Sequence, residues 1–147
     1  MKLKRISAFL FAVILAVSLS PSSMATSNSN ETVIDLGDGF YVVETIEMLP
    51  TPYAGDTIYG AKNIKLYQDG VLIGTTTLGG VFDISGSTAK ATSGNITGTG
   101  SNGWTYQSGT TSCSGNTVYG TATYKSSTGS TKSHTSSISC SPNGTLS

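Results

Sequence analysis

The chain contains one histidine, His134, which is the first residue to consider for catalytic chemistry. A catalytic histidine needs a carboxylate to orient it and a nucleophile to activate. Many serines surround His134 in the sequence, but every Asp and Glu precedes Ile84, so an acid reaches it only across the fold. Glu44 and Glu47 lie three apart in a strand and point to opposite faces, which argues against an acid–base pair. We therefore expect no catalytic residue, and a hydrolase is the least favoured function.

Oxygen ligands for a hard metal ion are the next possibility, because Asp35 and Asp38 alternate with Gly37 and Gly39. Their spacing does not fit an EF-hand loop. A turn in which Asp bonds its own backbone and Gly takes positive φ explains the same residues. One histidine and two cysteines are too few for a zinc site. We expect no metal and no cofactor.

Aromatic side chains in the polar half of the chain supply the other kind of candidate site. Such side chains with little charge around them suit stacking on neutral sugars or packing on another protein. The predicted ligand-contact residues are Trp104, Tyr106, Tyr119 and Tyr124. Two alternatives stay open. A lone Trp in a small sandwich is usually core, and Tyr119 and Tyr124 differ in parity, so they share a surface only across a bulge.

The best-determined element is a hairpin from Thr57 to Ile84, folded about Gln68-Asp69-Gly70. A three-residue loop pairs Leu66 with Leu72 and places the even positions on one face. A two-residue loop would slip the register by one and split the apolar residues between the faces, so the three-residue loop is favoured. The expected core floor is Ile58, Ile64, Leu66, Leu72, Leu78, Phe82 and Ile84, with Lys65, Thr75, Thr77 and Asp83 facing water.

Short strands account for the rest of the chain. After a turn at 37–39, Phe40, Val42 and Ile46 share one parity and indicate a strand. Beyond Ile84, thirty of sixty-three residues are Ser or Thr, which is compatible with disorder, but apolar and aromatic residues alternate there between turn signals. The strands predicted in this half are 88–98, 104–112, 117–125 and 132–140. We expect an all-β, single antiparallel β-sandwich of about seven strands, immunoglobulin-like or jelly-roll-like, without a helix longer than a turn or two.

The first residues indicate export. Three cations precede an apolar run too short to span a bilayer, and Ser23-Met24-Ala25 is a small-x-small cleavage site, the pattern of a secretory signal peptide. We predict a signal peptide at 1–25, a flexible segment at 26–34 and a secreted sandwich domain at 35–147, without a membrane anchor. The mature chain holds five lysines against eight acidic residues, a formal charge of −3 without a basic cluster, which disfavours nucleic acid as a partner.

Cys113 and Cys140 are the only cysteines, and an exported chain favours a disulfide between them. Closing that loop would stabilise the fold by about 3 kcal/mol. Geometry raises an objection. In a simple meander of the last three strands, the two cysteines lie on strands that flank a common neighbour, about 9 to 10 Å apart and beyond bridging range. A disulfide therefore requires the last strand to cross to the other sheet.

Several short motifs follow one another along nearly the whole mature chain. They are DLGDGFYVVETIE from Asp35, Gly60-Ala61-Lys62, the run from Leu78 to Phe82, Ser85-Gly86-Ser87, Trp104, Ser114-Gly115-Asn116-Thr117, and the closing run from Ser139 to Gly144. In this order they make the chain similar to small secreted proteins of Gram-positive bacteria that contain a β-sandwich domain of unknown function. The resemblance implies the sandwich fold and supplies no catalytic residues.

Three classes of function remain after these arguments. A secreted, non-enzymatic binding or surface-interaction protein is favoured, because the chain combines an adhesive Ser, Thr, Gly and Tyr surface with few reactive groups; a cell-surface glycan or protein is its expected partner. A bacteriocin-like secreted toxin is the alternative, since small exported β-sandwich proteins of Gram-positive bacteria can act in this way. A secreted hydrolase ranks last.

Overall fold

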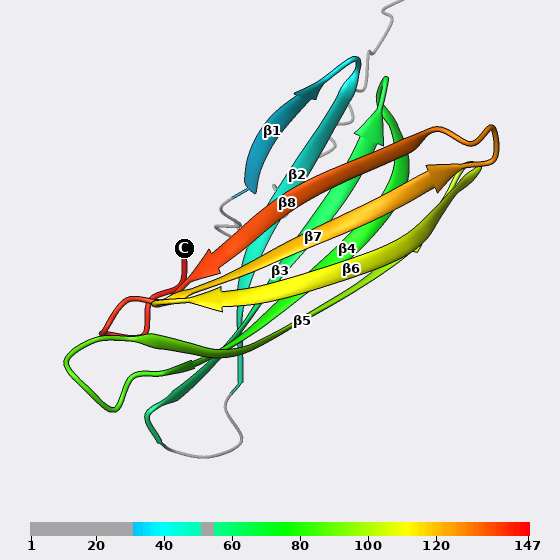
Figure 1. The fold of residues 1–147 in the computed structure, drawn as a ribbon. Coiled ribbons are helices and arrows are strands. Elements are labelled where there is room, and N and C mark those ends of the chain that lie inside the picture. Colours follow the sequence, from blue (N-terminus) through cyan, green and yellow to red (C-terminus); the bar gives the residue numbers. More distant parts are fainter. Residues whose placement is uncertain (1–30, 51–54) are drawn as a thin grey trace, which may run out of the picture.

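The computed structural model describes residues 31–50 and 55–147, and within them the chain is all β. Its eight strands are β1 (Glu31–Gly37), β2 (Phe40–Leu49), β3 (Thr57–Gln68), β4 (Val71–Asp83), β5 (Lys90–Gly100), β6 (Trp104–Ser114), β7 (Thr117–Ser126) and β8 (Thr131–Ser139). They form two antiparallel sheets, a larger one in the order β1-β2-β3-β4-β5 and a smaller one in the order β6-β7-β8 (Figure 1). The predicted all-β sandwich is confirmed, with eight strands where about seven were expected.

The strand order is a simple meander. Every hydrogen-bonded neighbour in the two sheets is also the next strand in the sequence, and the chain changes sheet between β5 and β6. Immunoglobulin-like and jelly-roll sandwiches use Greek-key connections instead, so this sandwich is connected more locally than either. Within the described residues, no helix has the length and apolar character needed to cross a membrane.

The sandwich domain begins earlier than predicted. β1 starts at Glu31, which pairs with Thr45 of β2, and the pairing continues along the strand. Residues 31–34 were expected to be flexible, but they belong to the larger sheet because their backbone groups find partners on β2. The predicted signal peptide at 1–25 lies outside the described residues.

The hairpin of β3 and β4 differs from the prediction at its loop. The loop has two residues, Asp69 and Gly70, both at positive φ (49° and 81°). Such a pair makes the turn whose twist matches that of a hairpin. A bulge at Ile73 then restores the predicted parity for the rest of the hairpin. Leu72, predicted to lie in the core, instead shares the outer face with its partner Tyr67, and Ile73 is buried in its place.

The core lies between the two sheets and follows the predicted even face of the hairpin. The larger sheet contributes Val42, Ile64, Leu66, Ile73, Leu78 and Phe82, and the smaller sheet contributes Val118, Ala122, Tyr124 and Ile138, all of them buried. Burying one large apolar side chain stabilises a fold by about 1.5 to 3 kcal/mol. Tyr124 fits into this layer because Gly74 opposite it has no side chain; a Cβ at Gly74 would overlap the Tyr124 ring.

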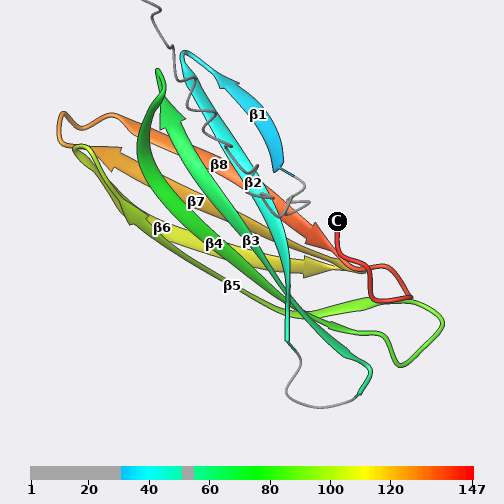
Figure 2. The same cartoon turned by 180° about the vertical axis from the view of Figure 1, so that it is seen from behind.

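The two long sides of the sandwich differ. On one side β5 and β6 adjoin: the Ala91 amide donates to the Gly115 carbonyl at 2.8 Å, and Thr111 Oγ1 donates to the Gly94 carbonyl at 3.1 Å. On the other side β8 is the last strand of the smaller sheet, and β1 lies beyond it without a strand of that sheet over it (Figures 1 and 2). We call the β5–β6 side the closed side and the β1–β8 side the open side.

The two cysteines are separate, and the predicted disulfide between them is wrong. Cys113 on β6 is an exposed free thiol, whereas Cys140, which follows β8, is a buried free thiol. Because β6 and β8 flank β7 and the last strand does not cross to the larger sheet, the two thiols keep the separation of a meander. The condition for a disulfide is therefore not met.

Candidate functional site

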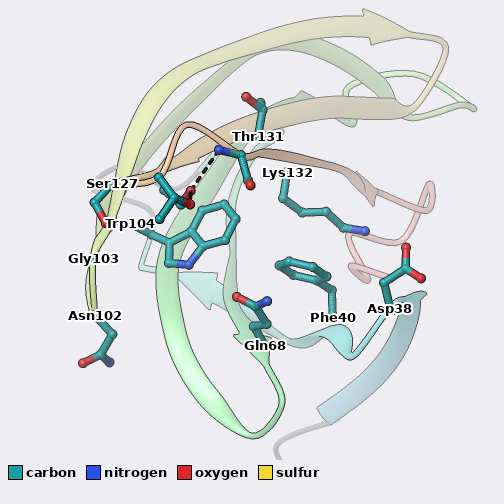
Figure 3. Close-up of a pocket in the computed structure, with 12 residues that line it drawn as sticks. Asp38, Phe40, Gln68, Asn102, Gly103, Trp104, Ser127, Thr131 and Lys132 are labelled. Atoms are coloured by element: carbon teal, nitrogen blue, oxygen red, sulfur yellow. Dashed lines mark hydrogen bonds between the residues drawn. The ribbon is translucent and has the colours of Figure 1, made fainter.

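A pocket of about 460 Å³ opens at one end of the sandwich, where three turns meet (Figure 3). These are the turns between β1 and β2, between β5 and β6, and between β7 and β8. The side chains that matter for its chemistry are Asp38, Phe40, Gln68, Asn102, Trp104 and Lys132, with Ser and Thr hydroxyls of the β7–β8 turn beside them. We call it the turn-end pocket.

Two aromatic rings form the apolar part of the turn-end pocket. Trp104 meets Phe40 edge to face, with ring centroids 5.8 Å apart and planes at 84°, a favoured geometry for an aromatic pair. Lys132 Nζ lies 4.5 Å from the centre of the Phe40 ring and donates to the Leu36 carbonyl at 3.1 Å. The cation–π contact and the hydrogen bond hold the Lys132 side chain beside the aromatic pair. Trp104 is half-buried, so part of its ring stays accessible.

Hydrogen bonds fix the turn that presents Trp104. Asn102 and Gly103 have positive φ (51° and 83°), and the Trp104 amide donates to the Ser101 carbonyl at 3.0 Å. Ser101 Oγ and Asn102 Nδ2 both donate to the Leu72 carbonyl, at 3.0 and 2.7 Å. The turn is thus fastened to the hairpin of the larger sheet. A ligand in this pocket would therefore meet Trp104 already in place, which would lower the entropy cost of binding.

The turn between β1 and β2 is held by its own residues. Asp35 Oδ1 accepts a hydrogen bond from the Gly37 amide at 2.8 Å, which is the turn role considered for this residue as the alternative to calcium binding. The Asp69 amide donates to the Gly39 carbonyl at 2.9 Å and joins this turn to the β3–β4 loop. Asp38, between the two glycines, is left to line the pocket.

The turn between β7 and β8 closes the pocket from the smaller sheet. The Ser130 amide donates to Ser126 Oγ at 2.9 Å, which tightens the turn. The Ser127 amide donates to the Gly103 carbonyl at 2.7 Å and ties it to the turn that carries Trp104. Three turns from both sheets therefore form one connected rim.

The polar groups of the turn-end pocket are balanced in charge. Figure 3 shows Lys132 and Asp38 beside Phe40, and Gln68 near both rings. One carboxylate and one ammonium offset each other, while the Gln68 amide and the rim hydroxyls add neutral donors and acceptors. The pocket can therefore stack the apolar face of a ligand and hydrogen-bond its edges, and it suits a ligand of little net charge.

Of the four aromatic residues predicted to form one contact region, only Trp104 lines the turn-end pocket. Tyr119 is 43% exposed, whereas Tyr124 is fully buried and its hydroxyl is hydrogen-bonded to Thr76 Oγ1 at 2.6 Å. Burial raises the pKa of Tyr124, and the bond to Thr76 opposes this shift only in part. Tyr106 is half-buried and meets Tyr124 edge to face, with ring centroids 5.6 Å apart.

The shared surface predicted for these tyrosines is therefore wrong. It required a bulge within β7 between Tyr119 and Tyr124, but the bulge in this pair of strands falls on β6, at Gln107. The two tyrosines consequently keep the opposite faces that their parity indicates. Tyr124 became a core residue because Gly74 leaves room for its ring.

Sequence reasoning missed Phe40, Gln68 and Lys132 as members of a site, and it considered Asp38 only as an oxygen ligand for a metal ion. A signal for them exists in the strand order. In an antiparallel meander alternate turns lie at the same end of the sheet, so the turns after β1, β3, β5 and β7 converge. The residues next to Asp69 and Asn102 are thereby brought together with those next to Asp38, although they are far apart in sequence.

A second group of polar side chains is buried between β2 and β3 of the larger sheet and β8 of the smaller one. Lys62 Nζ and Glu44 Oε2 form an ion pair at 3.1 Å, with 10% and 6% of their side chains exposed. Glu44 Oε1, both ring nitrogens of His134 and Ser136 Oγ are buried and have no hydrogen-bond partner among the described residues. Burial lowers the pKa of His134, and the nearby Glu44 carboxylate opposes this shift to a lesser extent. We call these four residues the buried polar cluster.

The buried polar cluster lacks the contacts of a catalytic histidine. Among the described residues, His134 makes no hydrogen bond to an acid or to a serine, and it does not line the turn-end pocket. Glu44 is buried and Glu47 is exposed, so the prediction that these two point to opposite faces is confirmed.

The turn-end pocket is the candidate site that combines an aromatic pair with polar groups. In residues 31–50 and 55–147, no group of three His, Cys, Asp or Glu side chains is placed to hold a metal ion. Comparisons of the chain with protein-family models, with curated proteins and with solved structures give no match. The geometry and chemistry of the pocket are therefore the basis for a proposal about function.

Proposed function

We propose that this chain is a secreted, non-enzymatic binding protein whose turn-end pocket takes a saccharide of little net charge, such as one carried on a cell surface. The observation that carries the proposal is the corner formed by Trp104 and Phe40 inside a pocket of about 460 Å³. Pockets that hold small ligands range over about 300 to 1,000 Å³. Secretion rests on the sequence pattern of residues 1–25, which lie outside the described residues.

The chemistry of the lining supports a saccharide over other small ligands. Sugar rings offer an apolar face of C–H groups and a polar edge of hydroxyls, which match an accessible indole and a rim of amide and hydroxyl groups. Asp38 and Lys132 offset each other, so the pocket does not select a strongly charged ligand. The fixed turns preorganise these groups and favour binding further.

The pocket also supports binding over hydrolysis. Most glycosidases use two carboxyl groups that flank the scissile bond. Asp38 is the one carboxylate among the residues that line the turn-end pocket, and His134 lies elsewhere, in the buried polar cluster. These residues suit a ligand that is held and released unchanged.

A glycan array probed with the mature protein, followed by calorimetry on the best ligand, tests the proposal. Trp104→Ala removes the stacking surface and is expected to weaken binding roughly thirtyfold, since aromatic anchors contribute about 2 kcal/mol or more. Gln68→Ala, a smaller change at the same pocket, is expected to weaken binding severalfold. Tyr119→Ala is the matched control, because it removes an exposed aromatic ring from another face.

The two pocket variants separate loss of a contact from loss of the fold. Gln68→Ala keeps the aromatic pair, so it reports on the pocket even if Trp104→Ala proves unstable. The proposal is wrong if the protein binds no glycan on the array. It is also wrong if the pocket variants bind as tightly as Tyr119→Ala while their circular dichroism is unchanged.

A further inference from the structure

The outer edge of β8 offers a row of backbone groups without a paired strand. Ser139 donates to the Ser147 carbonyl at 2.8 Å and accepts from the Ser147 amide at 3.0 Å, on the side away from β7. Because strand backbones alternate, Ser133, Thr135 and Ser137 direct their N–H and C=O groups to that same side. Among the described residues, no strand pairs with β8 there. The edge from Thr131 to Ser137 is therefore open to strand addition.

Residues 145–147 already occupy the first positions along this edge. They fold back after β8 and run antiparallel to it, with Leu146 bridged to Cys140. The Leu146 side chain packs inward against Gly60, where a Cβ would be crowded by it. This short segment shows which kind of peptide can pair with the edge. Its backbone is extended, the apolar Leu146 side chain turns inward, and the hydroxyl residues Thr145 and Ser147 flank it in the sequence.

The larger sheet leaves an apolar surface uncovered opposite this edge. Ile34 pairs with Val42, which faces the core, yet Ile34 is 38% exposed because no strand of the smaller sheet covers β1. Met48 on the same side of the sheet is 58% exposed. A cavity of about 510 Å³ lies between this surface and residues 145–147, and its wall includes Glu44, whose Oε1 is buried without a partner.

The other three edges of the sandwich are protected. β5 and β6 adjoin on the closed side through Thr111 and Gly94. β1 carries the charges of Glu31 and Asp35 and a bulge beside Asp35, two common devices against strand pairing. The edge of β8 lacks such protection. Its one charged side chain from residue 131 to 137 is Lys132, whose ammonium group donates a hydrogen bond to the Leu36 carbonyl of β1.

We propose that the open side binds an extended peptide that pairs antiparallel with β8 in line with residues 145–147 and turns alternate apolar side chains toward Ile34. Such strand addition draws affinity from main-chain hydrogen bonds and specificity from pockets for alternate side chains. A second copy of β8 is a poorer occupant, because it would present the polar side chains of Lys132, His134 and Ser136 to the apolar surface. The peptide site is separate from the turn-end pocket.

A synthetic library of nine-residue peptides with Thr at odd positions and Val, Ile, Leu or Phe at even positions tests the proposal. Peptides retained by the immobilised protein are expected to slow amide hydrogen exchange at Ser133, Thr135 and Ser137 by at least about tenfold, with little change at the even residues already paired to β7. Two N-methylated forms of the best peptide give the matched comparison: methylation of the amides that face β8 abolishes binding, and methylation of the alternate amides does not.

Variants of the protein locate the site. Thr135→Pro removes an outward amide that β7 does not use, which edge strands tolerate, and is expected to weaken binding about tenfold, whereas Thr135→Ala binds normally. Ile34→Lys is expected to weaken binding similarly, and Gly86→Ala, where an added Cβ meets nothing closer than 3.9 Å, to leave binding unchanged. The proposal is overturned if no library peptide is retained, if both N-methylated forms bind alike, or if protection of the edge instead rises with protein concentration, which would assign it to a second copy.

Discussion

The closed and open sides of the sandwich are built from different kinds of residue. On the closed side, Gly94 and Gly98 of β5 leave space for Val118 and Tyr106, so the two sheets approach closely and bury apolar groups. Toward the open side, the interior holds the buried polar cluster, and the larger sheet extends beyond the smaller one. The small residues of β5 permit close packing, whereas the shorter sheet leaves groups and edges available for contact.

This difference gives the two sides of one small domain different physical sensitivities. Apolar groups packed against glycine are sensitive to any added atom, because protein interiors are close-packed. Buried charges and unpaired polar atoms, by contrast, contribute little net stability and are costly when one partner is lost. We therefore expect substitutions on the two sides to lower the free energy of unfolding for different physical reasons.

The largest effect is expected from breaking the buried ion pair. In the wild type, Lys62 Nζ lies 3.1 Å from Glu44 Oε2. Lys62→Met leaves the Glu44 carboxylate buried without this cation. Loss of one partner of such a pair lowers the free energy of unfolding by roughly 3 kcal/mol, because the remaining charge stays desolvated or takes up a proton. Urea unfolding followed by circular dichroism measures the change.

Replacing both partners provides the control for that prediction. Glu44→Leu combined with Lys62→Met removes both buried charges, and the double variant is expected to unfold within about 1 kcal/mol of the wild type. If it is as unstable as Lys62→Met alone, the ion pair contributes net stability and the contrast between the two sides does not hold.

On the closed side, the added atom itself is the disturbance. A Cβ at Gly94 would overlap Val118, which is fully buried, so Gly94→Ala is expected to lower the free energy of unfolding by about 2 kcal/mol. Gly86→Ala is the matched control, because nothing lies closer than 3.9 Å to a Cβ there. Equal urea midpoints for the two variants would mean that the sheets separate easily on the closed side.

Acid is expected to weaken the buried polar cluster through His134. Its pKa is lowered from 6.5 by burial, so below that pH the unfolded chain binds a proton that the folded chain does not. The contribution of neutral His134 to the free energy of unfolding is therefore complete above pH 6.5. It falls as the pH drops toward the lowered pKa, with a slope of at most about 1.4 kcal/mol per pH unit. The Glu44 carboxylate, which is paired with Lys62, faces His134 from the larger sheet, and Tyr124 stacks beside His134 with ring centroids 6.3 Å apart.

Urea unfolding at a series of pH values, with His134→Phe as the reference, measures this effect. The variant cannot take up the proton, so its stability is expected to change less between pH 7 and pH 5. If the free energies of unfolding of the two proteins change with pH in parallel, His134 is not the group responsible for the acid sensitivity.

Most strands and the positions of the turns between them were predictable from the sequence because their signals are local, although the start of β1 and the length of the β3–β4 loop were not. Gly and Asn at positive φ, such as Asn102-Gly103, end one strand and begin the next within three residues. The strand predicted at 117–125 is β7, Thr117–Ser126, and the one predicted at 104–112 is β6, Trp104–Ser114. The apolar parity of the hairpin was correct beyond its bulge for the same reason.

The site was less predictable because it depends on pairing between distant residues. Leu72 and Ile73 are both apolar, so the sequence alone does not say which one the bulge turns inward. Tyr124 is core only because Gly74 is opposite it in the other sheet. The pairing of Glu44 with Lys62 likewise follows from the register of β2 on β3, which no local pattern specifies.

The smallest effect is expected from reduction of the protein, because one thiol lies on β6, the other follows β8, and the two are not bonded. Cys113 on β6 is exposed, whereas Cys140 beyond β8 is buried, and burial raises the pKa of the Cys140 thiol. Iodoacetamide is expected to modify one cysteine in the folded protein and two in urea, because the thiolate is the reactive form and must be accessible. Dithiothreitol is expected to leave the melting temperature unchanged. A mass two units lower than that of the reduced chain, or a drop of several degrees on reduction, would show instead that β6 and β8 approach each other in solution and that the two sides are bridged.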